Sequence, residues 1–240
     1  MKAIAFIFAR GGSKGIPRKN LSLLDGKPLL AWAIDSARSC PSVGRVIVST
    51  DDDEIASMGR QFGAEVPFIR PSYLAQDGSP EWLAWRHAVN FVQTSDGPFD
   101  TFLAVPTTSP LRSPEDLERC IAKIQTGCDA VVTVTEANRN PYFNMVRFDE
   151  DGCVKIAVET GRIIANRQDA PPVYDLTTVA YAVKPQLIMT ANDIFDGRVK
   201  AVVVPRERSL DIDTPFDLQF AEFIVKTTRP PASPSATIGL

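Results

Sequence analysis

The sequence predicts an α/β fold, with a Rossmann-like, mostly parallel sheet and helices on both of its faces. Strand-like apolar runs alternate with helix-like segments along most of the chain, which is the order that parallel sheets require. The length of 240 residues suits one such domain, and a hydrophobic content of 44% is enough for its core. A glycine-rich basic loop directly follows the first strand, at the edge where open α/β sheets bind ligands.

The expected strands are short apolar runs rich in β-branched and aromatic residues. They cover residues 3–8, 45–50, 99–105, 129–135 and 201–205. Residues 65–71 are expected to form a short edge strand, because prolines punctuate them and edge strands tolerate proline.

Helices are expected to begin at proline, serine or acidic residues that suit a first turn. These starts are Pro28, Asp51, Gly78 to Glu81, Ser113 and Pro215. The third helix should bury a set of apolar residues at helical spacing: Trp82, Leu83, Trp85, Ala88, Val89 and Phe91. His87, the only histidine, lies on this helix and is interpreted as structural, because it has no neighbouring nucleophile.

The alternation breaks at residues 137–176, which we interpret as an insertion. It holds two strand-like pieces, near residues 144–148 and 154–158, with Gly152 between them as in a hairpin. The proline-rich tail at residues 229–240 is expected to be disordered. Residues 1–228 are then one domain that includes the insertion.

Composition excludes several classes of protein. The net charge of -3 gives no overall basic surface for nucleic acid. The four cysteines are widely spaced and are interpreted as reduced, mostly buried thiols. No signal peptide and no apolar run of about 18 residues is present. We therefore expect a soluble, cytoplasmic protein without membrane contact.

Residues 9–20, Ala-Arg-Gly-Gly-Ser-Lys-Gly-Ile-Pro-Arg-Lys-Asn, are the strongest functional signal. Three glycines let backbone amides approach a ligand, and four cations stand among them without an acid. This combination suits a polyphosphate, with a solvated basic turn as the alternative. The loop fits neither a Walker A nor a Gly-x-Gly-x-x-Gly motif.

Asp211 and Asp213 form a second candidate. In an extended backbone their carboxylates point the same way, which is a donor set for Mg2+. The alternative, which is compatible with metal binding, is that Asp213 caps the helix that begins at Pro215.

Together with Thr108-Ser109-Pro110-Leu111-Arg112 and Asp211-Ile212-Asp213-Thr214-Pro215, the basic loop resembles the CMP-sialic acid synthetases (acylneuraminate cytidylyltransferases) over residues 1–228. The resemblance implies a nucleotidyltransferase that moves CMP from CTP to the anomeric hydroxyl of an acidic 2-keto nonulosonate and releases pyrophosphate. It also implies Mg2+ and a homodimer, with residues 137–176 as the dimerisation arm and Arg167 near the partner's site.

The resemblance assigns roles to residues. Those for the nucleotide are Ala9, Arg10, Gly11, Gly12, Ser13, Lys14, Lys19, Asn20, Arg70 and Ser79. Those for the sugar are Thr107, Thr108, Ser109, Arg112, Arg167, Gln168, Thr177 and Thr178. Arg10, Lys19, Asp211 and Asp213 are the catalytic set, with the two aspartates as metal ligands. Asn20 is expected to recognise cytosine, and Asp51 to help shape the site.

Two departures from the family pattern lie on the sugar side. Pro106-Thr107 replaces Gln-Pro, and Thr177-Thr178 replaces Asn-Gly. Threonines offer methyl groups and single hydroxyls in place of amides, so we expect a less hydroxylated sugar, of legionaminic or pseudaminic type, to be preferred over N-acetylneuraminate.

Other functions stay open at this point. They are a sugar-phosphate nucleotidyltransferase that uses another NTP, a cytidylyltransferase for an eight-carbon ulosonate, and a non-catalytic nucleotide-binding or scaffold protein. The sequence leaves the sugar, the general base, the metal stoichiometry and any oligomer larger than a dimer undetermined.

Overall fold

A computed structural model of the chain describes residues 2–161 and 164–228, so the expected disorder of residues 229–240 lies outside the described residues. Six strands form one sheet in the order β10-β6-β9-β5-β1-β4. They are β1 (Ala3–Phe8), β4 (Val43–Ser49), β5 (Phe102–Ala104), β6 (Ala130–Glu136), β9 (Tyr174–Val183) and β10 (Val199–Val203). In this sheet β9 pairs antiparallel with β5 and β6, whereas β1 pairs parallel with β4 and β5, and β6 pairs parallel with β10. The predicted mostly parallel sheet is confirmed.

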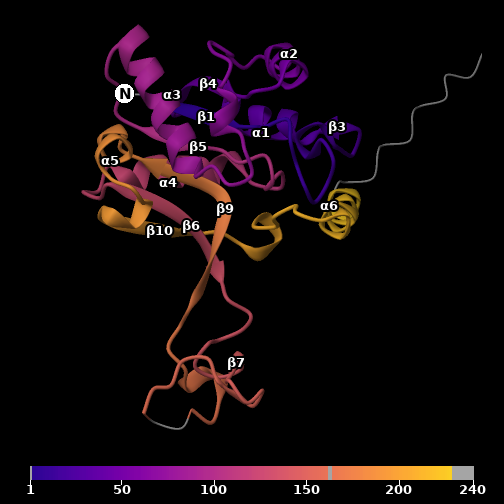
Figure 1. Cartoon of the computed structure of the whole chain (residues 1–240), viewed down its shortest axis with the longest axis vertical. Helices are drawn as coiled ribbons and strands as arrows, with labels where there is room; N and C mark the ends of the chain where they lie inside the picture. The colour runs from indigo at the N-terminus through magenta and orange to yellow at the C-terminus, as the bar shows by residue number, and fades with distance from the viewer. Residues whose placement is uncertain (1, 162–163, 229–240) are drawn as a thin grey trace, which may run out of the picture.

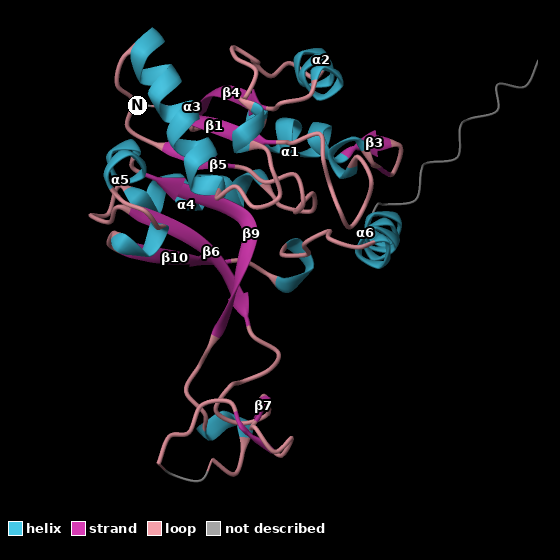
Figure 2. Cartoon of the chain, in the orientation of Figure 1, coloured by secondary structure: helices cyan, strands magenta, loops and turns pink. Residues whose placement is uncertain are grey.

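Helices cover both faces of this sheet, as expected (Figure 2). They are α1 (Leu29–Arg38), α2 (Asp53–Gln61), α3 (Glu81–Asp96), α4 (Pro114–Ile124), α5 (Pro185–Thr190) and α6 (Pro215–Thr228). Side chains of β1 alternate, so Ala3, Ala5 and Ile7 pack with α1, α2 and α4, whereas Ile4 and Phe6 pack with α3 and α5. β1 therefore contributes side chains to a hydrophobic core on each face of the sheet.

Short elements complete the chain. Five 3-10 turns are η1 (Lys19–Leu21), η2 (Ser72–Leu74), η3 (Arg167–Asp169), η4 (Ile194–Asp196) and η5 (Arg206–Arg208). Two small antiparallel pairs are β2 (Leu23–Leu24) with β3 (Lys27–Pro28), and β7 (Val146–Phe148) with β8 (Val154–Ile156). Among the helices of the described ranges, none is long and apolar enough to cross a bilayer.

The insertion forms an arm that projects from the domain (Figure 1). β6 and β9 run beyond the sheet as a ribbon, and the β7–β8 hairpin lies at the far end. Gly152, in the turn of that hairpin, has a φ of 78° that favours glycine. The predicted hairpin is confirmed with shorter strands than expected.

Several local predictions need correction. Residues 65–71 form no strand: a single bridge joins Glu65 to Ile47, since Pro67 and Pro71 lack the N–H that a ladder needs. Leu83 is 41% exposed, so it does not belong to the core that holds Trp85, Ala88 and Val89. Three cysteines are buried as expected, and Cys153 is exposed.

The segment between β10 and α6 is tied to the rest of the domain at three points. Arg208 Nε and Nη2 donate to the two carboxylate oxygens of the fully buried Asp116, at 2.8 and 2.9 Å. Ile212 N donates to Thr108 O at 2.8 Å. At Gly15, an added Cβ would lie 2.2 Å from the backbone oxygen of Asp213. These contacts hold Asp211 and Asp213 against two loops at the sheet edge.

We predict that Arg208→Gln destabilises the fold by about 2 kcal/mol, because it leaves the buried Asp116 carboxylate without its main cation. Arg119 is a matched control, since it lies 3.9 Å from the same carboxylate but is half exposed. Arg119→Gln should cost less than about 1 kcal/mol in urea unfolding. Equal costs for the two variants would contradict the assigned role of Arg208.

We predict that Gly15→Ala lowers stability by about 2 kcal/mol, since its Cβ would force the basic loop away from Asp213. Gly12→Ala is the control in the same loop, because nothing lies within 4 Å of the position of its Cβ. Thermal unfolding should separate the two variants by several degrees, and an unchanged midpoint for Gly15→Ala would refute the close contact.

Candidate active site

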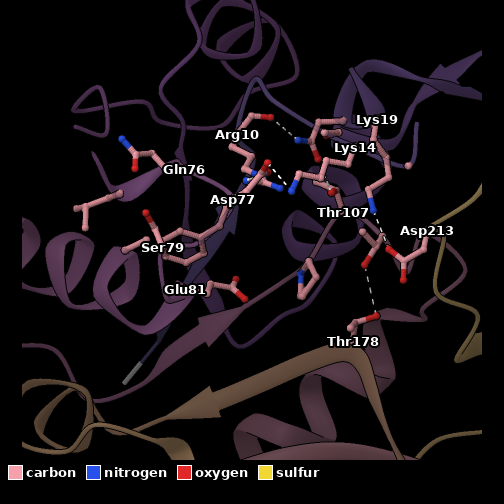
Figure 3. A pocket seen from close by; sticks show the side chains of 18 of the residues that line it. Arg10, Lys14, Lys19, Gln76, Asp77, Ser79, Glu81, Thr107, Thr178 and Asp213 are labelled. Carbon is pink, nitrogen blue, oxygen red and sulfur yellow. Dashed lines mark hydrogen bonds and ion pairs between the residues drawn. The ribbon is translucent and has the colours of Figure 1, made fainter. Parts of the chain in front are cut away.

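A cavity of about 600 Å³ opens where β1 and β5 end (Figure 3). Its walls come from the basic loop after β1, the segment from Arg70 to Ala84, the turn after β5, and β9. The lining residues are Phe8, Arg10, Ser13, Lys14, Gly15, Lys19, Asn20, Arg70, Leu74, Gln76, Asp77, Ser79, Glu81, Ala84, Pro106, Thr107, Thr108, Thr178, Tyr181 and Asp213. The cavity therefore sits at the edge of the sheet that the sequence predicted.

The structure brings most of the predicted site residues to this cavity. Those that line it are Arg10, Ser13, Lys14, Lys19, Asn20, Arg70, Ser79, Thr107, Thr108, Thr178 and Asp213. Ala9, Gly11 and Gly12 belong to the same loop but do not line the cavity. Thr177 and Asp211 line a second cavity of about 620 Å³. Arg167 and Gln168 lie on the arm.

Carboxylates neutralise the three lining cations of the basic loop. Arg10 Nη1 and Lys14 Nζ lie 2.7 and 2.8 Å from the two oxygens of Asp77 (Figure 3). Lys19 Nζ donates to Asp213 Oδ1 at 2.9 Å and to Ile212 O at 3.0 Å. The predicted anion-binding groups thus point into one cavity, where protein carboxylates hold them.

Arg18, the fourth cation of the loop, faces another way. Its guanidinium donates to both oxygens of Asp52, at 3.0 and 3.1 Å, and to Glu54. The Arg18 hydrogen bond is the main reason why the pKa of Asp52 lies below its usual value. Asp52 also caps α2 by accepting from Glu54 N and Ile55 N. Arg18 therefore anchors the loop to the start of α2.

Asn20 and Asp51 shape the loop from behind. Asn20 is 6% exposed; its Nδ2 donates to Arg10 O at 2.9 Å, and its Oδ1 accepts from Thr107 Oγ1 at 2.6 Å. Gly11 N donates to Asp51 Oδ1 at 3.1 Å. Asn20 retains one N–H and one lone pair for a ligand, so its predicted recognition of cytosine stays a prediction.

Arg70 is a buried guanidinium whose donors are only partly used. It is 5% exposed, and its Nε and Nη2 make no hydrogen bond within the described ranges. Asp51 Oδ1 lies 3.7 Å from Arg70 Nη2. Burial lowers the pKa of Arg70, and Asp51 and Glu81 oppose that shift. Unpaired donors at a cavity wall suit a carbonyl or anionic oxygen of a ligand.

Three titratable lining residues were not predicted: Asp77, Glu81 and Tyr181. Glu81, in the first turn of α3, accepts from Trp85 Nε1 at 3.2 Å, and burial raises the pKa of its carboxyl. Burial also raises the pKa of Tyr181, on β9, to about 12. The sequence signal for Glu81 was its place at a helix start beside the ligand edge, where a capping role explained it equally well.

An irregularity in β9 separates Thr177 from Thr178. Val132 of β6 pairs with Tyr181, but the next residue, Thr133, pairs with Thr177, so β9 bulges between them. Thr178 lines the cavity, where its hydroxyl lies 2.7 Å from Ser109 Oγ. Thr177 instead donates to Thr133 Oγ1 inside the protein. Thr177 therefore lies outside this cavity, and its predicted contact with the sugar stays a prediction.

Arg112 and Ser109 do not line the cavity in this chain, and their predicted contact with the sugar stays a prediction. Arg112 is 5% exposed, donates from Nε to Val179 O at 2.8 Å, and also donates to Pro106 O. Burial lowers the pKa of Arg112 to about 9, against the opposing charges of Asp116 and Asp211. Arg112 thus fastens the turn after β5 to β9, and its guanidinium does not line the cavity.

Asp211 and Asp213 do not open onto one cavity, contrary to the simple alternation argument. Asp213 is exposed and pairs with Lys19, whereas Asp211 Oδ1 is buried without a hydrogen-bond partner in the described chain. Asp213 does not cap α6 either: Thr214 Oγ1 accepts from Asp217 N, and Asp217 accepts from Thr214 N.

The two aspartates still suit Mg2+ as a donor set. Magnesium uses one or two carboxylates and takes its other ligands from water and phosphate oxygens. The unpaired buried oxygen of Asp211 is an anionic acceptor of that kind. No group of three or more His, Cys, Asp or Glu that could hold a metal occurs within residues 2–161 and 164–228. A larger cage built from protein alone is thus not present there.

Arg167 and Gln168, predicted for the sugar, are not brought to the cavity of this chain. They begin η3 on the arm, where Arg167 Nη2 donates to Ala137 O at 3.0 Å. A smaller hollow at the base of the arm includes both residues. A contact between these two residues and a sugar would therefore need the cavity of a second copy of the chain.

The chain is similar to known cytidylyltransferases. Residues 4–145 match the family model described as cytidylyltransferase. A CMP-N,N'-diacetyllegionaminic acid synthase of Campylobacter jejuni is 30% identical over 91% of this chain and 93% of that protein. A pseudaminic acid cytidylyltransferase of C. jejuni is 30% identical over 95% of this chain and 98% of the relative.

The fold also matches a solved structure. CMP:2-keto-3-deoxy-manno-octonic acid synthetase, in complex with CTP, superposes with a TM-score of 0.67 at 16% identity, over 95% of this chain and 99% of that one. At this identity the match supports the fold alone. The family model covers more than half of the chain, and the relatives span nearly all of it. This chain therefore belongs to the cytidylyltransferase family and is a nucleotidyltransferase.

Proposed function

We propose that the cavity binds CTP and transfers its CMP to the anomeric hydroxyl of an acidic 2-keto nonulosonate sugar. The observation that carries this proposal is the convergence of Arg10, Lys14 and Lys19 on one cavity whose other wall carries threonine hydroxyls. Cations and loop amides suit a triphosphate, and hydroxyls suit a sugar. Membership of the cytidylyltransferase family supports a cavity with one side for the nucleotide and one side for the acceptor.

In the proposed reaction the anomeric oxygen forms a bond to the α-phosphorus of CTP. The bond from that phosphorus to the oxygen that bridges to the β-phosphate breaks, and pyrophosphate leaves with the bonding electrons. The proton of the hydroxyl is released in the same transfer. Arg10, Lys14 and Lys19 bind the triphosphate oxygens and stabilise the charge that develops on the leaving group. Arg70 supplies its unpaired donors to the nucleotide.

Asp211 and Asp213 would hold the proposed Mg2+. Bound there, the ion would neutralise phosphate charge during the transfer. The buried Oδ1 of Asp211, which has no hydrogen-bond partner in the described chain, supports this assignment, because leaving a buried acceptor without a partner costs free energy. Lys19 Nζ, now on Asp213, would be free to turn to the phosphates once a metal ion takes that carboxylate.

The proposed acceptor is a deoxygenated, amino-modified nonulosonate. Thr107, Thr108 and Thr178 give the acceptor wall single hydroxyls and methyl groups, without an amide side chain from the turn after β5. Relatives named for legionaminic and pseudaminic acids support the same class. The proposal places the enzyme in the cytoplasm, where CTP is available and its free thiols stay reduced.

The proposal predicts pyrophosphate release from CTP with a legionaminic- or pseudaminic-type acid, at a kcat/KM at least tenfold above that for N-acetylneuraminate, since unpaired substituents cost roughly 1–3 kcal/mol each. An assay that crosses four NTPs with these sugars and an eight-carbon ulosonate measures it.

Asp211→Asn should require more Mg2+, while Asp175→Asn, in the same second cavity, should not. Preference for N-acetylneuraminate or for another NTP would refute the assignment.

The arm supports a proposed homodimer. Its hairpin exposes large apolar side chains to solvent: Met145, Val146, Phe148, Val154 and Val158, between 42% and 75% exposed. Such a surface at the end of a projecting arm is typical of an interface between protein copies. A two-fold dimer would also bring Arg167 and Gln168 toward the site of the partner subunit.

We predict that Phe148→Asp dissociates this dimer at micromolar concentration, because it places a charge in the apolar interface. Phe216→Asp is the matched control: Phe216 lies on α6 and is 74% exposed, against 75% for Phe148. Light scattering should give monomers for Phe148→Asp and dimers for Phe216→Asp. A monomeric wild-type protein with full activity would contradict both the dimer and its role.

A further inference from the structure

One carboxylate bridges the two walls of the cavity. Asp77 Oδ1 lies 2.7 Å from Arg10 Nη1, and Asp77 Oδ2 lies 2.8 Å from Lys14 Nζ (Figure 3). Arg10 and Lys14 belong to the loop after β1, whereas Asp77 belongs to the turn between η2 and α3. A single acidic group thus occupies both cations at the place proposed for a triphosphate.

The bridge imitates a phosphate contact. A carboxylate and a phosphate group both offer two anionic oxygens to neighbouring donors, so they compete for the same cations. Hydrogen bonds from Lys14 and Arg10 hold the pKa of Asp77 below its usual value, and it stays ionised at neutral pH. Among the residues that the structure describes, the carboxylate forms ion pairs with these two cations alone.

The turn that carries Asp77 lies at the surface, with Gln76, Asp77 and Gly78 exposed. Ser79 N donates to Gln76 O at 3.1 Å, and Ser79 Oγ donates to Tyr73 O at 2.6 Å. Across the cavity, Arg10 Nη1 also approaches Ala75 O at 3.4 Å. Nothing lies within 4 Å of the position of a Cβ at Gly78. Displacement of Asp77 therefore needs no repacking of the core.

We propose that Asp77 is a built-in competitor for the triphosphate site, which keeps Arg10 and Lys14 occupied in the free enzyme and returns to them as pyrophosphate leaves. This inference rests on the proposed function for the identity of the nucleotide, but the competition itself concerns any polyphosphate. The side chains of Arg10, Lys14 and Asp77 are 34% to 77% exposed, and exposed ion pairs are weak enough to exchange. A polyphosphate replaces both ion pairs of Asp77 and makes further contacts with the loop. Orthophosphate replaces only the contacts that Asp77 gives up.

Calorimetric titration with inorganic tripolyphosphate in metal-free buffer tests the competition without assuming CTP. Asp77→Asn should bind tripolyphosphate and pyrophosphate roughly tenfold more tightly than wild type, because the competing charge is gone. Asp100→Asn is the matched control, since it removes the same charge from an exposed residue just before β5, at the opposite end of that strand from the cavity. It should change the affinity less than about twofold.

The kinetic counterpart is product inhibition. In Asp77→Asn the inhibition constant for pyrophosphate should fall by a similar factor, and orthophosphate should inhibit at concentrations that leave wild type unaffected. Asp77→Ser should behave like Asp77→Asn. The double variant Lys14→Gln/Asp77→Asn should lose the tighter binding of pyrophosphate. That loss would show that Asp77→Asn acts by releasing Lys14.

Unchanged or weaker binding of tripolyphosphate by Asp77→Asn would overturn the inference. Weaker binding of CTP only when Mg2+ is present would also overturn it and would make Asp77 a metal ligand. If wild type binds tripolyphosphate but not CTP, and Asp77→Asn tightens the former, the proposed function fails while the competitor stands.

Discussion

The close contact between the loop after β1 and the segment before α6 is the constraint on which the site depends. Gly15 approaches the backbone of Asp213, and Lys19 donates to Ile212 O and to Asp213. Ile212 N in turn donates to Thr108 O in the turn after β5. These bonds join three segments that are about a hundred residues apart in the chain. Without them the cations, the hydroxyls and the carboxylates would not share one edge of the sheet.

Much of the fold could be predicted because local chemistry and tertiary structure agree. β1, β4 and β6 are buried apolar runs, and Ser113 with Asp116 forms the capping box that their sequence spacing suggests. Apart from residues 65–71, where prolines prevent a strand, the failures are places where long-range contacts decide the structure. The bulge in β9 moves Thr178 into the cavity and Thr177 out of it, and no periodicity reveals such a shift. Likewise, the motif marks Arg112 as a functional candidate, but the sequence does not show that Arg112 donates to Val179 O.

The distribution of charge explains how a mildly acidic chain can carry a basic loop. Asp77 neutralises two cations of that loop, Asp213 and Asp52 neutralise one each, and all three acids come from other segments. The sequence shows the cations together because they are adjacent, but the acids are scattered and meet them only in the fold. A basic stretch without acids is therefore no evidence of unpaired charge in three dimensions, and an anionic ligand must compete with carboxylates for it.

Asp77 and Asp213 differ in the way they compete. Asp77 lies on an exposed turn, so a ligand can displace the whole group from the cavity. Asp213 is fixed by the contact of its backbone with Gly15, so only its side chain can exchange partners. A cation that neutralised Asp213 would release Lys19 without moving the backbone, whereas a polyphosphate must move Asp77 away. The two ends of the proposed triphosphate site are thus freed by different events, and both are local because neither disturbs the buried sheet.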